Sequence, residues 1–147
     1  MENTVLLYEQ QLRASVSGID GLEKLEQACE HALLNWGVAN PAFLFALHEA
    51  LINAFEANCR CGRSDAFLSA TLRLNAEQLT AEIPDHGPGL PQNWREICQS
   101  QTMQDLLWKE CGRGLLFMQN FCQEIDSNFD QTGRHIMILK AGIEKHG

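Results

Sequence analysis

Two stretches of alternating apolar and polar residues constrain the fold of this chain more than any other feature. Residues 67–75 and 78–85 each alternate with a period of two, which is the period of a half-buried strand. Only a short turn at residues 75–77 separates them, so we expect neighbouring strands. Because one side of each strand is apolar, other apolar elements must cover that side of the sheet. The residues on it are Leu68, Ala70, Leu72, Leu74, Leu79, Ala81 and Ile83.

Helical periodicity precedes these strands. Apolar residues recur at steps of three and four from Ile19 to Trp36, which predicts an amphipathic helix that ends near Gly37. Asn40-Pro41 predicts a second helix that extends to about Asn58, because asparagine caps helices and proline suits the first helical position. The residues expected to face inward are Ile19, Leu22, Leu25, Cys29, Leu33, Trp36, Phe43, Leu47, Leu51 and Ala54.

The remaining pattern indicates the fold class. We expect further strands at residues 4–14, 124–128 and 135–140 and a helix at residues 115–122. Residues 86–113, rich in Gly, Pro and Gln, are expected to be irregular with one short helix. This order predicts an α+β fold, a two-layer α/β sandwich with helices on one face of a mixed, mainly antiparallel sheet. The length of 147 residues predicts one domain, residues 1–147.

Composition excludes several classes of function. The chain has 11 Lys and Arg against 19 Asp and Glu, a formal net charge of -8, which argues against general binding of nucleic acid. No apolar run approaches the roughly 20 residues of a membrane span, and the N-terminus lacks the pattern of a signal peptide. We therefore expect a cytoplasmic protein whose six cysteines are reduced thiols. Cys59 and Cys61 lack the second pair that a structural zinc site needs.

Two polar constellations suggest chemistry. Glu49 and Asn53 lie four residues apart, so they share one face of the second helix and could orient a water and a hard cation such as Mg²⁺. An exposed polar stripe is the alternative.

Asp85 continues the inward phase of its strand, and a buried carboxylate needs donors, for which the amino group of adenine is suitable. Gly87 and Gly89 permit close approach of the backbone to a ligand. A capped turn is the alternative there.

A third constellation is Gly112-Arg113-Gly114, directly before the helix expected from Leu115. Glycines at a helix N-terminus expose backbone N–H groups to an anion, and the Arg113 guanidinium suits phosphate oxygens. The pattern is neither a Walker A motif nor a Rossmann fingerprint. An ordinary glycine-containing loop is the alternative.

In this order the three constellations resemble those of the GHKL (Bergerat-fold) ATPases. Within that superfamily the chain resembles the small anti-sigma factor serine kinases of the RsbW and SpoIIAB type, over roughly residues 4–140. Residues 49–54 resemble the N-box of these proteins and residues 85–90 their first glycine box. Residues 112–115, with Met118, are similar to their second box.

The resemblance implies a Mg-ATP site beneath a lid of about residues 90–111. Asn53 would ligate Mg²⁺, Asp85 would select adenine, and Thr132 could help to seat the base. Glu49 would take the proton of a substrate serine, and Arg113 would stabilise the transferred phosphoryl group. The residues carried over as nucleotide-binding are Asn53, Asp85, Gly87, Gly89, Gly112, Arg113, Gly114, Leu115 and Thr132.

The resemblance also implies partners. The substrate would be a STAS-domain anti-sigma factor antagonist, and the same protein, as a homodimer, would hold a sigma factor, without direct contact to nucleic acid or membrane. Two departures favour an alternative. Ala57 stands where a histidine is common, and Arg134 follows Gly133 where a threonine is usual. The alternative is a non-catalytic ATP-binding module that sequesters a sigma factor or another regulator. The short lid and the second box argue against the detached catalytic domain of a histidine kinase.

Overall fold

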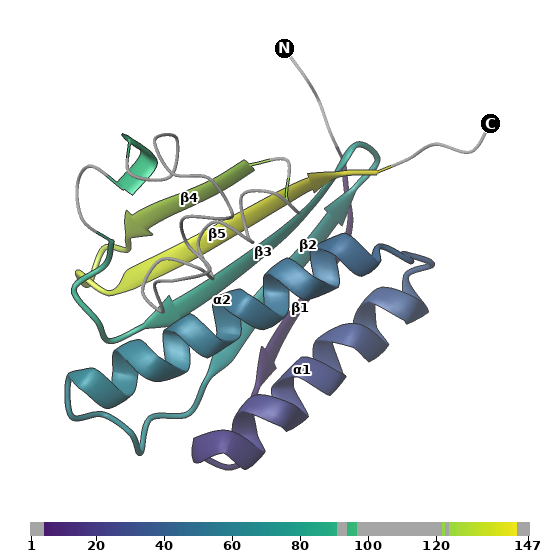
Figure 1. Ribbon diagram of the computed structural model, residues 1–147. Coiled ribbons are helices and arrows are strands. Elements are labelled where there is room, and N and C mark those ends of the chain that lie inside the picture. Colours follow the sequence, from purple (N-terminus) through teal and green to yellow (C-terminus); the bar gives the residue numbers. More distant parts are fainter. Residues whose placement is uncertain (1–4, 91–93, 97–121, 123, 144–147) are drawn as a thin grey trace, which may run out of the picture.

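The computed structural model describes residues 5–90, 94–96, 122 and 124–143 of the chain. Within these residues, two helices and five strands follow one another in the order expected from the sequence (Figure 1). Their bounds are β1 Leu6–Arg13, α1 Gly18–Asn35, α2 Pro41–Arg60, β2 Ser69–Asn75, β3 Gln78–Asp85, β4 Glu124–Phe129 and β5 His135–Gly142.

The strands form one sheet in the order β1-β2-β3-β5-β4, and every pairing among the described residues is antiparallel. Both helices lie on the same face of this sheet, as Figure 1 shows. The α+β fold class is therefore confirmed. In the register of the sheet, Asp85 at the end of β3 stands opposite His135 at the start of β5.

The β2–β3 hairpin follows from its sequence. Its turn is held by the side-chain oxygen of Asn75, which accepts hydrogen bonds from the backbone N–H groups of Glu77 at 2.9 Å and Gln78 at 2.7 Å. Every apolar residue expected on the covered side is buried. The opposite side of the hairpin carries polar residues such as Thr71, Arg73 and Glu82, which are partly exposed. A sheet with one polar face needs a helical layer on the other face only.

The helical layer supplies the second half of the core. The Asn40 side chain caps α2 by accepting a hydrogen bond from the Phe43 N–H at 3.0 Å, and Pro41 occupies the first turn. The residues expected to face inward are buried, except for Ile19 in α1 and Trp36 directly after it. Trp36 is only partly buried and stacks on Tyr8. Ile19 is 61% exposed, so its inward placement was wrong. It lies in the first turn of α1, at the margin of the apolar stripe.

Other expected elements lie partly outside the described residues. Within residues 86–113, where one short helix was expected, Trp94–Glu96 form a helical turn with Trp94 buried. The helix expected at residues 115–122 lies outside the described part, apart from Cys122. Among the described residues, no helix is both long and apolar enough to cross a membrane.

Two neighbouring leucines test the orientation of α1. Leu33 is 2% exposed and Leu34 is 58% exposed. We expect Leu33→Ala to lower the free energy of unfolding by about 2–5 kcal/mol, because it removes buried contacts and leaves a cavity. Leu34→Ala, the matched control, changes it by less than about 0.5 kcal/mol. Urea unfolding of both variants measures the difference, and equal losses would contradict the orientation.

Candidate functional site

Asp85 is buried, as the phase of its strand predicted, and both of its oxygens are hydrogen-bonded. It is 4% exposed. Its Oδ1 accepts a hydrogen bond from the Gly87 N–H at 2.7 Å, and its Oδ2 lies 2.8 Å from Nδ1 of His135. These donors offset the cost of removing a carboxylate from water. Each carboxylate oxygen has a second lone-pair position, so Asp85 can still accept a hydrogen bond from a ligand.

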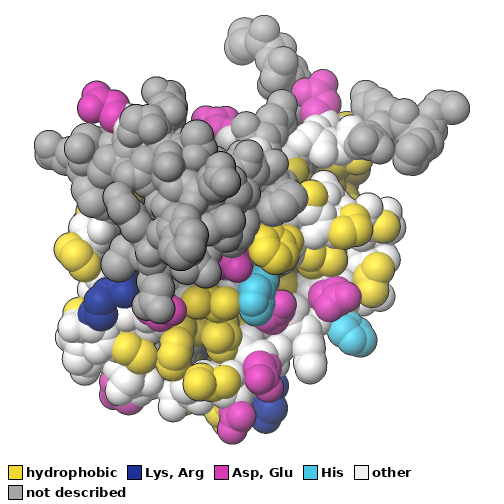
Figure 2. Space-filling view, in the orientation of Figure 1, with side chains coloured by type: hydrophobic (Ala, Val, Ile, Leu, Met, Phe, Trp, Pro, Cys, Tyr) yellow, Lys and Arg dark blue, Asp and Glu magenta, His cyan; other side chains and the backbone are white. Residues whose placement is uncertain are grey.

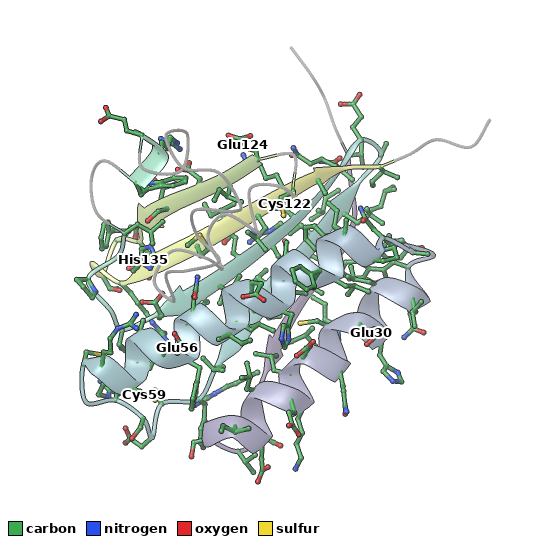
Figure 3. All side chains as sticks on the ribbon, in the orientation of Figure 1. Glu30, Glu56, Cys59, Cys122, Glu124 and His135 are labelled. Carbon is green, nitrogen blue, oxygen red and sulfur yellow. The ribbon has the colours of Figure 1, made fainter. Side chains whose placement is uncertain are left out.

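His135 is the main residue of this site that the sequence reasoning missed. It is 3% exposed, and its Nε2 lies 2.6 Å from Oγ of Ser127 in β4. In the tautomer whose Nδ1–H donates to Asp85, Nε2 accepts a hydrogen bond from the Ser127 hydroxyl. Figure 3 places His135 at the same end of the molecule as Glu56 and Cys59 near the end of α2. The His135–Asp85 contact thus completes a buried polar chain across three strands.

The end of α2 is tied to the end of β3. Asn58 is buried, and its Oδ1 accepts a hydrogen bond from the His86 N–H at 2.7 Å. This contact fixes the turn that follows Asp85 against the helix. Ala57 lies beside the same turn, because a Cβ atom added to Gly87 would lie 2.9 Å from the Cβ of Ala57.

The local structure explains why glycine occupies positions 87 and 89 of the turn. A Cβ at Gly87 would also lie 3.0 Å from Oδ1 of Asp85, so a side chain there would disturb the carboxylate. Gly89 has φ +86°, and a Cβ there would approach Phe129 at 2.8 Å and His135 at 3.1 Å. Both positions therefore require glycine to keep the surroundings of Asp85, whether or not a ligand is bound.

Glu49 and Asn53 lie on the face of α2 that leads to this turn. Residues 49, 53 and 57 are spaced by four, so their side chains stack along one face of the helix. Of these three residues, Ala57 lies next to Gly87. Glu49 and Asn53 are both partly exposed. Within the described part of the chain, neither has a hydrogen-bond partner, so both are available to a ligand.

The turn between β4 and β5 closes the other side of the site. A pocket of about 300 Å³ is lined by Asp85, His86, Gly87, Thr132, Gly133 and Arg134. The Thr132 hydroxyl donates to Oδ1 of Asp130 at 2.6 Å. This bond, followed by the bonds from the backbone N–H groups of Arg134 and Thr132, lowers the pKa of Asp130. Thr132 thus borders the pocket, while His135 makes the direct contact to Asp85.

The second box lies outside the described residues. This applies to Gly112, Arg113, Gly114 and Leu115 and to most of the expected lid. Among the described residues, no group of three or more His, Cys, Asp or Glu side chains could hold a metal ion. A protein cage for a metal is therefore not found in that part. A single amide such as Asn53 still fits Mg²⁺, which usually keeps water and phosphate ligands.

The described cysteines are free thiols. Burial, followed by the charge of Glu26, raises the pKa of Cys29 to about 12, and burial alone raises the pKa of Cys122 to about 12. These two thiols therefore stay protonated at neutral pH and are poor nucleophiles.

Removing His135 tests the buried polar chain. We expect His135→Ala to lower the free energy of unfolding by about 1–3 kcal/mol without any ligand, because Asp85 and Ser127 both lose a partner. His31→Ala, at an exposed position of α1, serves as the control and should leave stability nearly unchanged. Chemical unfolding measures both variants, and equal stability of the two would contradict the chain.

Comparison with known proteins places this geometry in a family. A family model described as histidine kinase-like ATPase domain matches residues 22–140. No curated protein matches. Among solved structures, a chain of the SiaB–SiaC complex from Pseudomonas aeruginosa is similar in fold, with a TM-score of 0.52 and 16% sequence identity over 94% of this chain and 91% of that one. The chain therefore belongs to the histidine kinase-like ATPase family.

Proposed function

We propose that this protein is an ATP-dependent serine protein kinase and anti-sigma factor in a partner-switching pathway. It would phosphorylate a STAS-domain anti-sigma factor antagonist and, in another state, hold a sigma factor. One observation carries the proposal. A buried, hydrogen-bonded carboxylate at Asp85 lies beside the end of α2, on which Glu49 and Asn53 share one face.

The adenine base would bind next to Asp85. This carboxylate is held by His135 and by the Gly87 N–H, so its remaining lone pairs point in fixed directions. A fixed acceptor favours adenine, whose amino group donates, over guanine, whose corresponding oxygen accepts. Thr132 borders the same pocket and would contribute to the base site.

The order of residues along α2 suits the length of a nucleoside triphosphate. Ala57 adjoins the turn after Asp85. At a rise of 1.5 Å per residue, Asn53 stands about 6 Å and Glu49 about 12 Å further along the helix. Asn53 would thus reach the phosphates and Glu49 the terminal phosphate, with Gly112 to Leu115 of the second box also contributing to phosphate binding.

Transfer would need little covalent chemistry from the protein. Glu49 accepts the proton of the substrate serine while the serine oxygen bonds to the γ-phosphorus. The bond from that phosphorus to its bridging oxygen breaks, and ADP leaves. Arg113 offsets charge on the transferred group. Mg²⁺, held by Asn53, supplies further charge stabilisation when bound.

A protein partner is supported by the fold relative. That solved structure is a complex of two proteins, SiaB and SiaC. This chain would likewise engage protein partners in the cytoplasm. It would form a homodimer, for which the exposed apolar side chains of Leu6 and Leu7 in the edge strand β1, with Val5 directly before it, are one available surface.

A second candidate function is a non-catalytic ATP-binding module that sequesters a sigma factor or another regulator. Ala57 favours it, because no imidazole extends from α2 toward the turn at Gly87. A histidine enters the site from β5 instead, as His135. The two candidates differ in whether a phosphoserine forms on the partner.

Nucleotide binding is tested by thermal unfolding with and without Mg-ATP. At 100 times its dissociation constant a ligand stabilises the protein by about 2.7 kcal/mol, which for this size raises Tm by roughly 5–10 °C. We expect this shift in wild type and in the exposed Asp65→Asn control, and its loss in Asp85→Asn measured against its own ligand-free Tm. No shift in well-folded wild type would contradict the proposal.

Phosphoryl transfer is tested on the cognate STAS-domain protein with Glu49→Gln. We expect the rate to fall at least about 100-fold, because no other general base is proposed, while the thermal shift with Mg-ATP remains. Glu56→Gln changes the same charge at an exposed position of α2 and should keep the rate. A Glu49→Gln rate equal to wild type would remove Glu49 as the base. Absence of phosphoserine with wild type would favour the second candidate.

A further inference from the structure

A second and larger pocket lies next to the Asp85 site. It has a volume of about 510 Å³ and is lined by residues of several elements, among them Arg13, Arg63, Ser69, His86 and Arg134. We call these five residues with their pocket the arginine pocket. Arg13 comes from the end of β1 and Arg63 from the loop after α2, while Ser69 begins β2. Since these residues lie far apart in sequence, the fold itself assembles the pocket.

The arginine pocket adjoins the pocket beside Asp85, because His86 and Arg134 line both of them. In β2 the partly exposed Ser69 alternates with the buried Ala70. Neighbouring residues of a strand project to opposite faces. The register also pairs Arg13 with Ser69. Ser69 and its partner Arg13 therefore lie on the face of the sheet opposite to the two helices, which Figure 1 shows on one face only.

This gathering of positive charge is unusual for the chain. Three of its 11 Lys and Arg residues line one pocket, although the net charge is -8. Figure 2 shows acidic side chains over the helical face instead. Among the described residues that line the pocket, only Asp65 is acidic, and its Oδ1 lies 3.9 Å from Nε of Arg63. Both are exposed, so this pair is weak and leaves Arg63 available to a ligand.

One arginine of the pocket contacts an aromatic ring, and another has an unpaired buried donor. The Arg13 guanidinium lies 5.1 Å from the centre of the Phe67 ring. The Nε atom of Arg134 is buried and has no hydrogen-bond partner within the described structure. A buried donor without a partner is costly, and an anion in the pocket would supply the missing acceptor.

The positive charges of the pocket also act on His86. Its pKa is lowered by burial first, and then by the charges of Arg134 and Arg63, while Asp85 and Asp65 act in the opposite direction. His86 is thus a neutral imidazole beside guanidinium groups at neutral pH. An anion bound there would favour the protonated ring.

We propose that the arginine pocket binds a phosphate monoester dianion. A phosphate monoester offers three oxygens and nearly two negative charges, which match several guanidinium groups better than one carboxylate does. The volume also exceeds that of a single inorganic ion and leaves room for the group to which the phosphate is attached. Two sources share this chemistry, a phosphoserine of a protein and a small phosphate ester. The proposal goes beyond the proposed kinase function, because its ligand is not ATP, although the arginine pocket shares His86 and Arg134 with the pocket beside Asp85.

The experiment follows the imidazole signal of His86 by NMR in the nucleotide-free protein, assigned with His86→Asn. O-phosphoserine is titrated, with serine as the control that lacks the phosphate group. We expect a saturable shift with O-phosphoserine only, and an upward change in the His86 pKa at saturation. Affinity should fall about tenfold in Arg63→Gln, because one charge-assisted contact is lost.

Arg60→Gln is the matched control, because Arg60 lies on α2 close to Arg63 but pairs with Glu56 and does not line the pocket. Its affinity should equal that of wild type. No saturable shift in wild type, or an equal loss in Arg60→Gln, overturns the proposal. Tighter binding of a phosphoserine peptide than of O-phosphoserine identifies a protein source, and equal binding identifies a small phosphate ester.

Discussion

Burial of Asp85 on the helix-covered side of the sheet is the constraint on which the site depends. A carboxylate in this position is stable only if donors surround it. The turn after β3 supplies one donor through Gly87, and β5 supplies the other through His135. Asp85 and His135 stand opposite each other in the sheet. The carboxylate therefore keeps its His135 partner only if β3 and β5 pair in this register. The hydrogen bond between Ser127 and His135 links β4 to the same arrangement.

The helical layer converts that buried carboxylate into a site. Asn58 binds the backbone of His86, so the C-terminal part of α2 cannot shift along β3 without losing a buried hydrogen bond. Glu49 and Asn53 are part of the same rigid helix and therefore keep a fixed distance from Asp85. Functional groups placed on rigid elements hold their geometry better than groups on loops. The fold thus keeps Asp85, Asn53 and Glu49 in a fixed arrangement without any ligand present.

Most of the fold could be predicted from the local periodicity of apolar residues, because strands and helices each have a fixed period. A strand has a period of two, so the buried side of Leu79 and Ile83 left Asp85 only one direction in which to point. Helical periodicity placed Leu25 and Leu47 inward in the same way. It failed at Ile19, because the first turn of a helix can lie beyond the surface that the rest of the helix covers.

The contacts of the site could not be predicted in this way. His135 and Asp85 are 50 residues apart in sequence, and their contact depends on which strands pair and in which register. The arginine pocket is an extreme case, because its residues share no local pattern and meet only in the folded chain.

The central claim is that Asp85 accepts a hydrogen bond from the amino group of adenine. Calorimetric titration with Mg-ATP and Mg-ITP tests it most directly, because inosine carries an oxygen in place of that amino group. The account predicts that ITP binds at least about 100-fold more weakly than ATP, since the buried carboxylate then faces an acceptor. Equal affinity for the two nucleotides would contradict it.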